Sequence, residues 1–292
     1  MTVFIRTLIS GLNLGSIYAL IALGYSMVYG IARMLNFAHG DIIMVGAYSG
    51  IVAVMSIGLP PIVGIFVGVI ICALLGVIIE RLAYKPLRQA PSLSILITAI
   101  GVSYLLQNLA LIIFGPDQKA YPTFSGIKSF KILGTKIDGM TILTLAVTAC
   151  IMVGLNLFIN KTKIGKAMRA VSEDKGAAEL MGISTDRTIT VTFAIGSALA
   201  AIASAFYGAT YVYILPTTGS MPGIKAFTAA VFGGIGSIPG AMLGGIVLGL
   251  IEQFAKQYIS TLWSNAIVFG VLIIVLLVKP TGLMGKKIQE KV

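Results

Sequence analysis

Three polar residues, Asn36, His39 and Asp41, interrupt a long apolar part of the chain and are candidates for handling a charged ligand. They belong to the stretch RMLNFAHGD at residues 33–41. A charge at the centre of a bilayer costs roughly 2.5–3.5 kcal/mol on insertion scales, so such groups usually pair or face a cavity. The stretch therefore predicts a broken helix whose free backbone groups line protein or water. The alternative is a short interfacial loop stabilised by attraction between Arg33 and Asp41.

A second break is expected in FGGIGSIPG at residues 232–240. Four glycines and a proline cannot continue a straight helix, so we expect a half-helix, a turn and a new helix near 226–240. Broken helices in corresponding positions of two halves are typical of a transporter's central pathway. The candidate path residues here are Gly234, Gly236 and Ser237. The two breaks align loosely, and whether they are inverted or parallel repeats stays open.

The sequence lacks the motifs of several kinds of catalytic chemistry. It contains no G-x-x-x-x-G-K-[ST] nucleotide-binding loop, no G-x-S-x-G and no H-E-x-x-H. A single histidine argues against most metal clusters, and Cys72 and Cys150 lie in apolar runs, where they are expected to pack rather than pair. No catalytic or metal-binding residue is predicted. The weakest alternative is an intramembrane enzyme centred on His39 and Asp41.

Few acids are expected at membrane depth, namely Asp41 and Glu252. Glu252 is followed four residues later by Lys256, which suggests an exposed helical ion pair. An ion-coupled carrier normally needs a denser intramembrane relay of such groups. The energy for transport would then enter elsewhere, most simply through a long polar segment.

That polar segment is residues 160–187, which carry six basic and four acidic residues in 28 positions. Apolar residues near helical spacing predict one or two short amphipathic helices over 166–181, with Gly182 as a helix stop. The segment is either a solvated connector or a docking element. Loops longer than about 12 to 15 residues are usually functional or disordered, and this composition is not typical of disorder.

The elements that position these residues are expected to be membrane-spanning helices. Hydrophobic residues make up 57% of the chain and charged residues 11%, which is too apolar for a water-exposed surface. A spanning helix needs about 20 apolar residues. We predict a single all-α transmembrane domain over 1–292 with about eight spans, give or take one. The apolar runs are 7–32, 34–57, 60–79, 93–114, 140–159, 189–211, the short 226–235, 238–254 and 262–278.

Glycines four residues apart are expected to let these helices pack closely, because small residues allow backbones to approach each other in lipid. This packing interpretation is favoured over a direct role in ligand binding. The pairs are Gly11/Gly15, Gly46/Gly50, Gly64/Gly68, Gly240/Gly244 and Gly245/Gly249.

Basic residues concentrate in 81–88, in 160–187 and after residue 278, which places these segments in the cytoplasm by the positive-inside rule. Residues 115–139 then face outward, although they carry four lysines, and the N-terminus lies outside. Their glycines, prolines and Asp-Gly pair favour an ordered loop with a hairpin, which either contacts an external partner or covers the surface. The net charge of +11 sits between spans, and no nucleic-acid motif accompanies it.

Three stretches resemble the permease subunits of ABC importers for branched-chain amino acids, specifically the LivH type. They are GLNLGSIYALIALGYSMVYGIARMLNFAHGDIIMVGAY (11–48), GKAMRAVSEDKGAAELMGISTDR (165–187) and IKAFTAAVFGGIGSIPGAMLGGIVLGLIE (224–252). The resemblance implies a non-catalytic pore subunit of a bacterial or archaeal inner membrane. It implies a second related permease, two cytoplasmic ATPase subunits that bind ATP and magnesium, and an external binding protein that delivers Leu, Ile or Val.

In this family the loop corresponding to 165–187 resembles the coupling loop that docks into a groove of the ATPase. The resemblance therefore makes coupling candidates of Arg169, Glu173, Asp174, Ala177, Ala178, Glu179 and Gly182. Lys175-Gly176 departs from the Pro-Glu pair that relatives often show, so the onset of the coupling helix is in question. NFAHGD and GGIGS are characteristic of the family without implying substrate contact. The rivals are a urea or short-chain amide permease of the same class and an ion-coupled carrier that works alone.

Overall fold

The computed structural model describes residues 2–122, 129–132 and 135–285, and helices dominate them. Short helices connect or interrupt the long ones, and two π-helical turns continue α2 and α3. The long helices are α1 (Thr2–Ala32), α2 (His39–Ile51, continued by Val52–Ser56), α3 (Pro61–Ile79, continued by Glu80–Tyr84 and the 3-10 turn Lys85–Leu87), α4 (Ser92–Phe114), α5 (Gly139–Lys161), α8 (Thr185–Tyr211), α10 (Ile238–Tyr258) and α11 (Ser264–Val278). The short helices are α6 (Lys163–Glu173), α7 (Lys175–Leu180) and α9 (Ser220–Gly233).

Among the described residues, seven helices are long and apolar enough to cross a membrane, and α11 is a shorter apolar helix. These eight helices confirm the prediction of an all-helical polytopic membrane protein. The short run at 226–235 is not a ninth span, because it belongs to α9, a half-helix of 14 residues.

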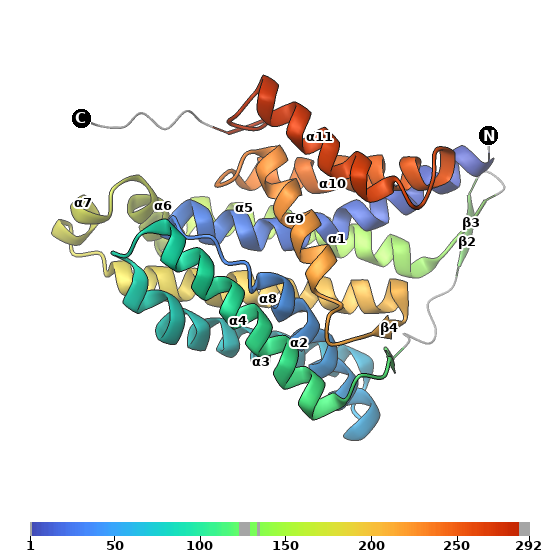
Figure 1. Ribbon diagram of the computed structural model, residues 1–292, viewed down its shortest axis with the longest axis horizontal. Coiled ribbons are helices and arrows are strands. Elements are labelled where there is room, and N and C mark those ends of the chain that lie inside the picture. Colours follow the sequence, from blue (N-terminus) through green and yellow to red (C-terminus); the bar gives the residue numbers. More distant parts are fainter. Residues whose placement is uncertain (1, 123–128, 133–134, 286–292) are drawn as a thin grey trace.

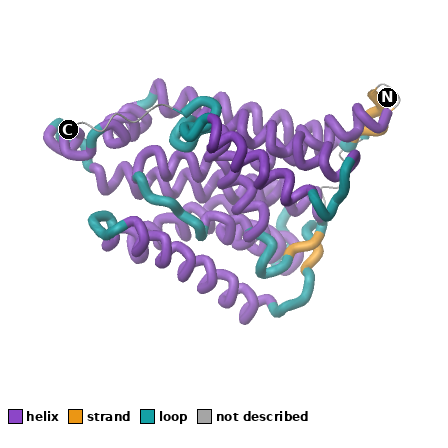
Figure 2. The backbone as a smooth tube through the Cα atoms, turned by 45° about the horizontal axis from the view of Figure 1, so that its top comes forward, coloured by secondary structure: helices purple, strands orange, loops and turns teal. Residues whose placement is uncertain are grey.

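Helix α1 forms the centre of the bundle, and residues 13–28 are all buried. It packs along α10 and also contacts α5, α8 and α9, while α3 and α2 lie against α8. Helices α1, α5, α8 and α10 run along the longest dimension of the molecule, and α4 and α11 are inclined to it (Figure 1). Figure 2 shows the same bundle of helices, with strands near the end that carries the N-terminus. Because large apolar side chains on α3, α4 and α5 remain exposed, these helices form the outer surface of the subunit.

Glycines explain how closely α1 approaches α10. A Cβ atom placed on Gly249 would lie 2.2 Å from the backbone nitrogen of Gly15, and one on Gly245 would lie 2.4 Å from Cα of Ala19. The other predicted glycine pairs also face neighbouring chain segments, as Gly46 does toward Ala201 of α8. The packing interpretation of the four-residue glycine spacing is therefore confirmed.

Both predicted helix breaks are present. Helix α1 ends at Ala32, and Arg33 adopts a positive φ of 60°, which turns the chain toward α2. Residues 234–237 separate α9 from α10, with positive φ angles at Gly234 and Gly236. Helix α9 begins at Ser220, earlier than expected, and tolerates Pro222 in its first turn because the missing N–H needs no partner there.

The two ends of the bundle differ. Helices α6 and α7 lie at one end, and the chain N-terminus lies at the other with the short strands (Figure 1). The α3–α4 connection shares the end of α6 and α7, because Lys85 and Arg88 form salt bridges with Asp186 at the start of α8. The segment after α11 joins this end too, since Leu283 N–H donates to the Phe232 carbonyl near the second break. The described parts of the three basic segments identified in the sequence thus converge.

The predicted hairpin in residues 115–139 is confirmed within the described residues. Strands β2 (Phe130–Ile132) and β3 (Thr135–Ile137) are antiparallel. The Asp-Gly pair does not form their turn: Asp138 instead caps α5 by accepting a hydrogen bond from Met140 N–H. Strand β1 (Lys119–Ala120) pairs with β4 (Tyr213–Ile214), which ties this loop to the α8–α9 connection.

Candidate functional site

The segment 160–187 folds as two short helices, as its pattern predicts. Thr162 caps α6 by accepting from Gly165 N–H, and Asp174 caps α7 by accepting from Ala177 N–H at 2.9 Å. Helix α7 therefore begins normally at Lys175 despite the departure from the Pro-Glu pair. Gly182 ends it with φ of 80°, a conformation that favours glycine.

The coupling candidates form a solvent-facing surface, except for Ala178. Glu173, Asp174, Ala177, Glu179 and Gly182 are exposed, Arg169 is exposed on α6, and Ala178 is buried. Leu180 and Met181, which helical spacing assigned to an apolar stripe, are instead 91% and 82% exposed at the tip of α7. Exposed apolar side chains surrounded by polar residues are typical of a surface that binds another protein. Leu180 and Met181 are thus further candidates for a protein-binding surface, which their helical spacing did not indicate.

Two contacts connect this segment to the end of α1. The Lys175 ammonium donates to the Ala32 carbonyl at 3.0 Å, and the Arg33 guanidinium donates to the Ser172 carbonyl at 3.1 Å. Burial, with help from Arg88 and Arg33, lowers the pKa of Lys175. Since Arg33 is directed at Ser172 and forms no salt bridge with Asp41, the predicted Arg33–Asp41 attraction is wrong.

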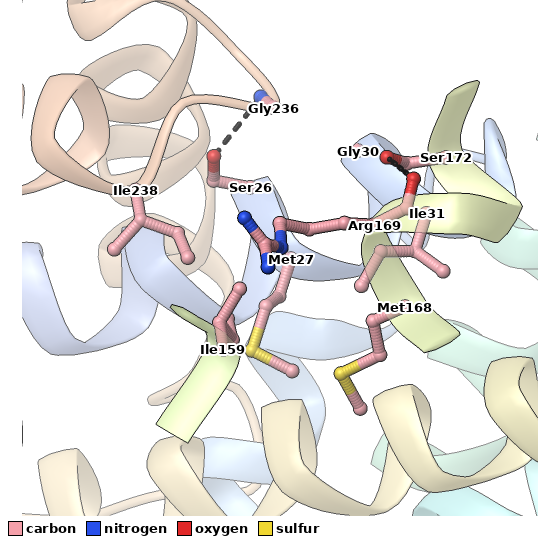
Figure 3. Close-up of a pocket in the computed structure, with 10 residues that line it drawn as sticks. All are labelled: Ser26, Met27, Gly30, Ile31, Ile159, Met168, Arg169, Ser172, Gly236 and Ile238. Atoms are coloured by element: carbon pink, nitrogen blue, oxygen red, sulfur yellow. Dashed lines mark hydrogen bonds between the residues drawn. The ribbon is translucent and has the colours of Figure 1, made fainter. Parts of the chain in front are cut away.

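The second break meets the segment 160–187 at a small cavity of about 80 Å³ (Figure 3). The Gly236 N–H donates to Oγ of Ser26 on α1 at 2.9 Å, which anchors the break. Arg169 of α6 lines the same cavity. A water molecule occupies about 30 Å³ in the liquid, so this space suits a few waters rather than an amino acid. Gly234 and Ser237 lie beside it, Gly234 packed on Gly285 and Ser237 capping α10.

Two polar residues of the first break, Asn36 and His39, are buried among other residues of the protein. The Tyr84 hydroxyl donates to the side-chain oxygen of Asn36 at 2.9 Å. His39 is buried with its ring 4.6 Å from that of Tyr25, and its Nε2 atom has no hydrogen-bond partner among the described residues. His39 and Asp41 form no hydrogen bond with each other in the structure, so no acid–base pair supports the intramembrane enzyme.

Asp41 lines a second cavity, with a volume of about 250 Å³. Ser103 donates to one carboxylate oxygen and Gln107 donates to the other at 2.9 Å. Gln107 also contacts Oγ of Ser220 at 3.2 Å, so α4 joins the first turns of α2 and α9. Close approach of Gly40 to Gly219 and Gly223 allows those two helix ends to meet.

Glu252 departs from the prediction of an exposed ion pair with Lys256. Its side chain is buried and accepts hydrogen bonds from Lys225 of α9 at 2.7 Å and from the Tyr18 hydroxyl of α1 at 2.9 Å. Lys256 does contact Glu252 at 2.7 Å, as its spacing suggests. The pair is therefore part of a buried network that crosses three helices.

The six path candidates do not form one site. Gly234, Gly236 and Ser237 lie near Arg169 of α6, whereas Asp41 faces the cavity of about 250 Å³ and Asn36 and His39 pack inside the protein. Gln107 and Ser220 were not predicted, because Gln107 is an ordinary polar residue in the apolar run 93–114 and Ser220 lies between the runs 189–211 and 226–235 without a motif. These two residues come together because Gly40 at the start of α2 lies close to Gly219 and Gly223 at the start of α9, and Gln107 of α4 reaches Ser220.

Comparison with known proteins identifies the family of this chain. Residues 7–277 match the family model described as the permease component of a branched-chain amino acid transport system. The chain is 44% identical to the high-affinity branched-chain amino acid transport system permease protein BraD of Pseudomonas aeruginosa, over 99% of this chain and 98% of that protein. It is equally identical, with the same coverage, to LivH of Escherichia coli. It is 26% identical to LivM of Escherichia coli, over 93% of this chain and 68% of LivM. With its spanning helices and its two breaks, the chain belongs to the family of permease components of branched-chain amino acid transport systems.

Proposed function

We propose that this permease forms the pathway through which an ATP-driven ABC importer moves Leu, Ile or Val across a bacterial or archaeal inner membrane. The match of residues 7–277 to the family carries this proposal. The names of BraD and LivH, which are similar along their whole length, supply the substrate class. Similarity to LivM supports a second, related permease as the partner in the membrane.

In this proposal ATP and magnesium bind to two cytoplasmic ATPase subunits, and the segment 160–187 docks into them. The exposed tip of α7 supports this role, because Leu180 and Met181 lie outside the apolar spans. An external binding protein delivers the amino acid at the opposite end, where residues 115–122 and β4 meet. The rival that carries urea or a short-chain amide differs in substrate but not in this architecture.

Reconstitution in proteoliposomes tests the proposal. The chain, its related permease, the ATPase pair and the binding protein are expected to take up radiolabelled leucine when ATP is supplied, and the chain alone is expected to take up none. Uptake by the chain alone under a proton or sodium gradient would instead establish a secondary carrier. Preference for urea over leucine would establish the amide rival.

Coupling is tested separately with Glu173→Arg and Gly182→Trp. Glu173 is exposed on the proposed docking surface, and Gly182 has a positive φ that a larger residue adopts only with strain. Both variants are expected to reach the membrane but to lose ATP-driven leucine uptake and co-purification of the ATPase subunits. Normal uptake and normal co-purification together would remove the docking role.

A further inference from the structure

The cavity beside Asp41 has the features of a binding site rather than of a packing gap. Asp41 is 1% exposed, and among the described residues no lysine or arginine forms a salt bridge with it. A buried carboxylate is ordinarily paired with a cation or satisfied by several hydrogen bonds. Ser103 and Gln107 provide its side-chain donors. A carboxylate offers about four acceptor positions, so the Asp41 carboxylate can accept a hydrogen bond from a further donor.

The position of this cavity suits a pathway. Ser103 is the middle residue of α4, and the cavity therefore lies near the centre of that span. Substrate sites of transporters built on broken helices typically lie near the bilayer midplane, where half-helix ends meet. Here the first turns of α2 and α9 meet through Gly40 and Gly223. The cavity reaches the surface between α4 and α9, where Tyr104 and Ile224 are 62% and 45% exposed.

The residues that line the cavity suit a small zwitterion with an apolar side chain. The cavity is lined by the apolar side chains of Phe37, Ile100 and Ile224 and by the polar groups of Asp41, Ser103, Gln107 and Ser220. A primary ammonium group carries three donors, which a carboxylate and neighbouring hydroxyl oxygens can accept. By contrast, the cavity of about 80 Å³ near Arg169 is too small for such a ligand.

We propose that the cavity binds the amino acid in transit, with its α-ammonium group on the Asp41 carboxylate and its side chain against Phe37, Ile100 and Ile224. This inference rests on the proposed function and deepens it by naming the recognised groups. Gln107 is a positioning residue, because it holds the carboxylate and Ser220 in place from α4. The ligand class is a small α-amino acid with an apolar side chain.

The test uses the reconstituted importer with ATP and leucine-loaded binding protein. Asp41→Asn keeps the shape of the side chain and removes its charge. Leucine uptake is expected to fall about tenfold or more, the loss expected for one charged hydrogen bond, while stimulated ATP hydrolysis stays at the wild-type level. The matched control is Asp138→Asn, the same change at the exposed cap of α5, where asparagine caps about as well as aspartate, and it is expected to leave uptake unchanged.

A second pair of variants changes shape and leaves the charge intact. Ile224→Trp fills the cavity and is expected to abolish uptake, whereas Met221→Trp on the same helix, at a similar exposure of 43%, does not line the cavity and is expected to retain uptake. If the Asp41→Asn complex fails to assemble, the comparison of these two tryptophan variants still tests the cavity assignment. Equal uptake by the two tryptophan variants, or normal uptake by an assembled Asp41→Asn complex, overturns the assignment.

The outcomes separate this inference from the proposed function. If the wild-type importer takes up no leucine, the proposed function is wrong. If it takes up leucine and Asp41→Asn does so equally well, the proposed function stands and the cavity assignment is wrong.

Discussion

The Glu252 carboxylate is buried inside the bundle, and its hydrogen-bond partners determine whether its charge stabilises the fold. The carboxylate accepts from Lys225, Lys256 and Tyr18, so its acceptor positions are well used. Lys225 is also nearly buried, with 8% of its side chain exposed, whereas 27% of the Lys256 side chain is exposed. Burying a charge is costly unless it is paired, and here one carboxylate neutralises a lysine that has little access to water.

Replacing Glu252 with leucine is therefore expected to destabilise the subunit by roughly 3–5 kcal/mol, the usual cost of breaking a buried ion pair from one side. Lys225 and the Tyr18 hydroxyl would lose their partner in the interior. Thermal unfolding of the purified subunit in detergent measures the effect. Lys256→Leu is the control and is expected to cost about 1 kcal/mol or less, since Lys256 reaches solvent and Glu252 keeps Lys225. Equal losses in the two variants would contradict this account.

The spacing of Glu252 and Lys256 predicted their contact, but it could not predict their burial. Residues four apart on a helix meet whatever surrounds them. Lys225 and Tyr18 reach Glu252 only because α9 and α1 pack against α10, and that packing joins residues 27 and 234 positions away. Arg33 illustrates the same limit: the interfacial-loop alternative paired it with Asp41, eight residues along the chain, and its actual partner is Ser172 of the segment 160–187.

At the scale of helices, some glycines lie where two backbones are in close contact, and others have free space beside them. Gly249 faces the backbone of Gly15, whereas Gly101 on α4 and Gly154 on α5 have no atom within 4 Å of an added Cβ. Gly249→Ala is expected to force α1 and α10 apart and lower the unfolding temperature. Gly101→Ala and Gly154→Ala are expected to raise it slightly, because alanine favours a helix over glycine by up to about 1 kcal/mol. The same thermal unfolding assay compares all three, and a stabilising Gly249→Ala would disprove close contact.

The tip of α7 allows a test of docking with a well-matched control. Leu180 on α7 and Leu262 before α11 are each 91% exposed, and they lie at opposite ends of the bundle. Leu180→Asp is expected to reduce co-purification of the ATPase subunits by tenfold or more, about 1.4 kcal/mol of binding free energy. Leu262→Asp makes the same chemical change and is expected to leave the assembly intact. An intact complex with Leu180→Asp would show that the tip is not buried on assembly.

Elements with strong local signals were predictable, and those defined by packing were less so. Glycine, proline and polar residues marked both breaks, and capping residues such as Asp174 account for the two helices in 160–187. The start of α9 was missed because its first turn, Ser220 to Gly223, carries a proline and no apolar periodicity. The cavity at Asp41 was not predictable as a cavity, since its wall comes from α1, α2, α4 and α9 and from Phe37 before α2, which the sequence keeps apart.

For the whole molecule, the distribution of polar segments gives the bundle two unlike ends. The basic α3–α4 connection, the segment 160–187 and the chain after α11 share one end, where Lys85 and Arg88 pair with Asp186. The short strands and the N-terminus occupy the other (Figure 1). The positive-inside rule assigns the first end to the cytoplasm, although the lysines in 115–139 weaken the contrast in charge.

Single cysteines at the two ends test this orientation in intact cells. Lys166 on α6 and Asp117 in the α4–α5 loop are both exposed, and Cys150→Ser leaves the buried Cys72 as the native thiol. With a membrane-impermeant maleimide, Asp117→Cys is expected to be labelled once the outer surface of the inner membrane is accessible. Lys166→Cys is expected to be labelled only after the inner membrane is opened. The reverse pattern would place α6 and α7 outside, where no ATP-hydrolysing subunit could reach them, and would refute the coupling proposal.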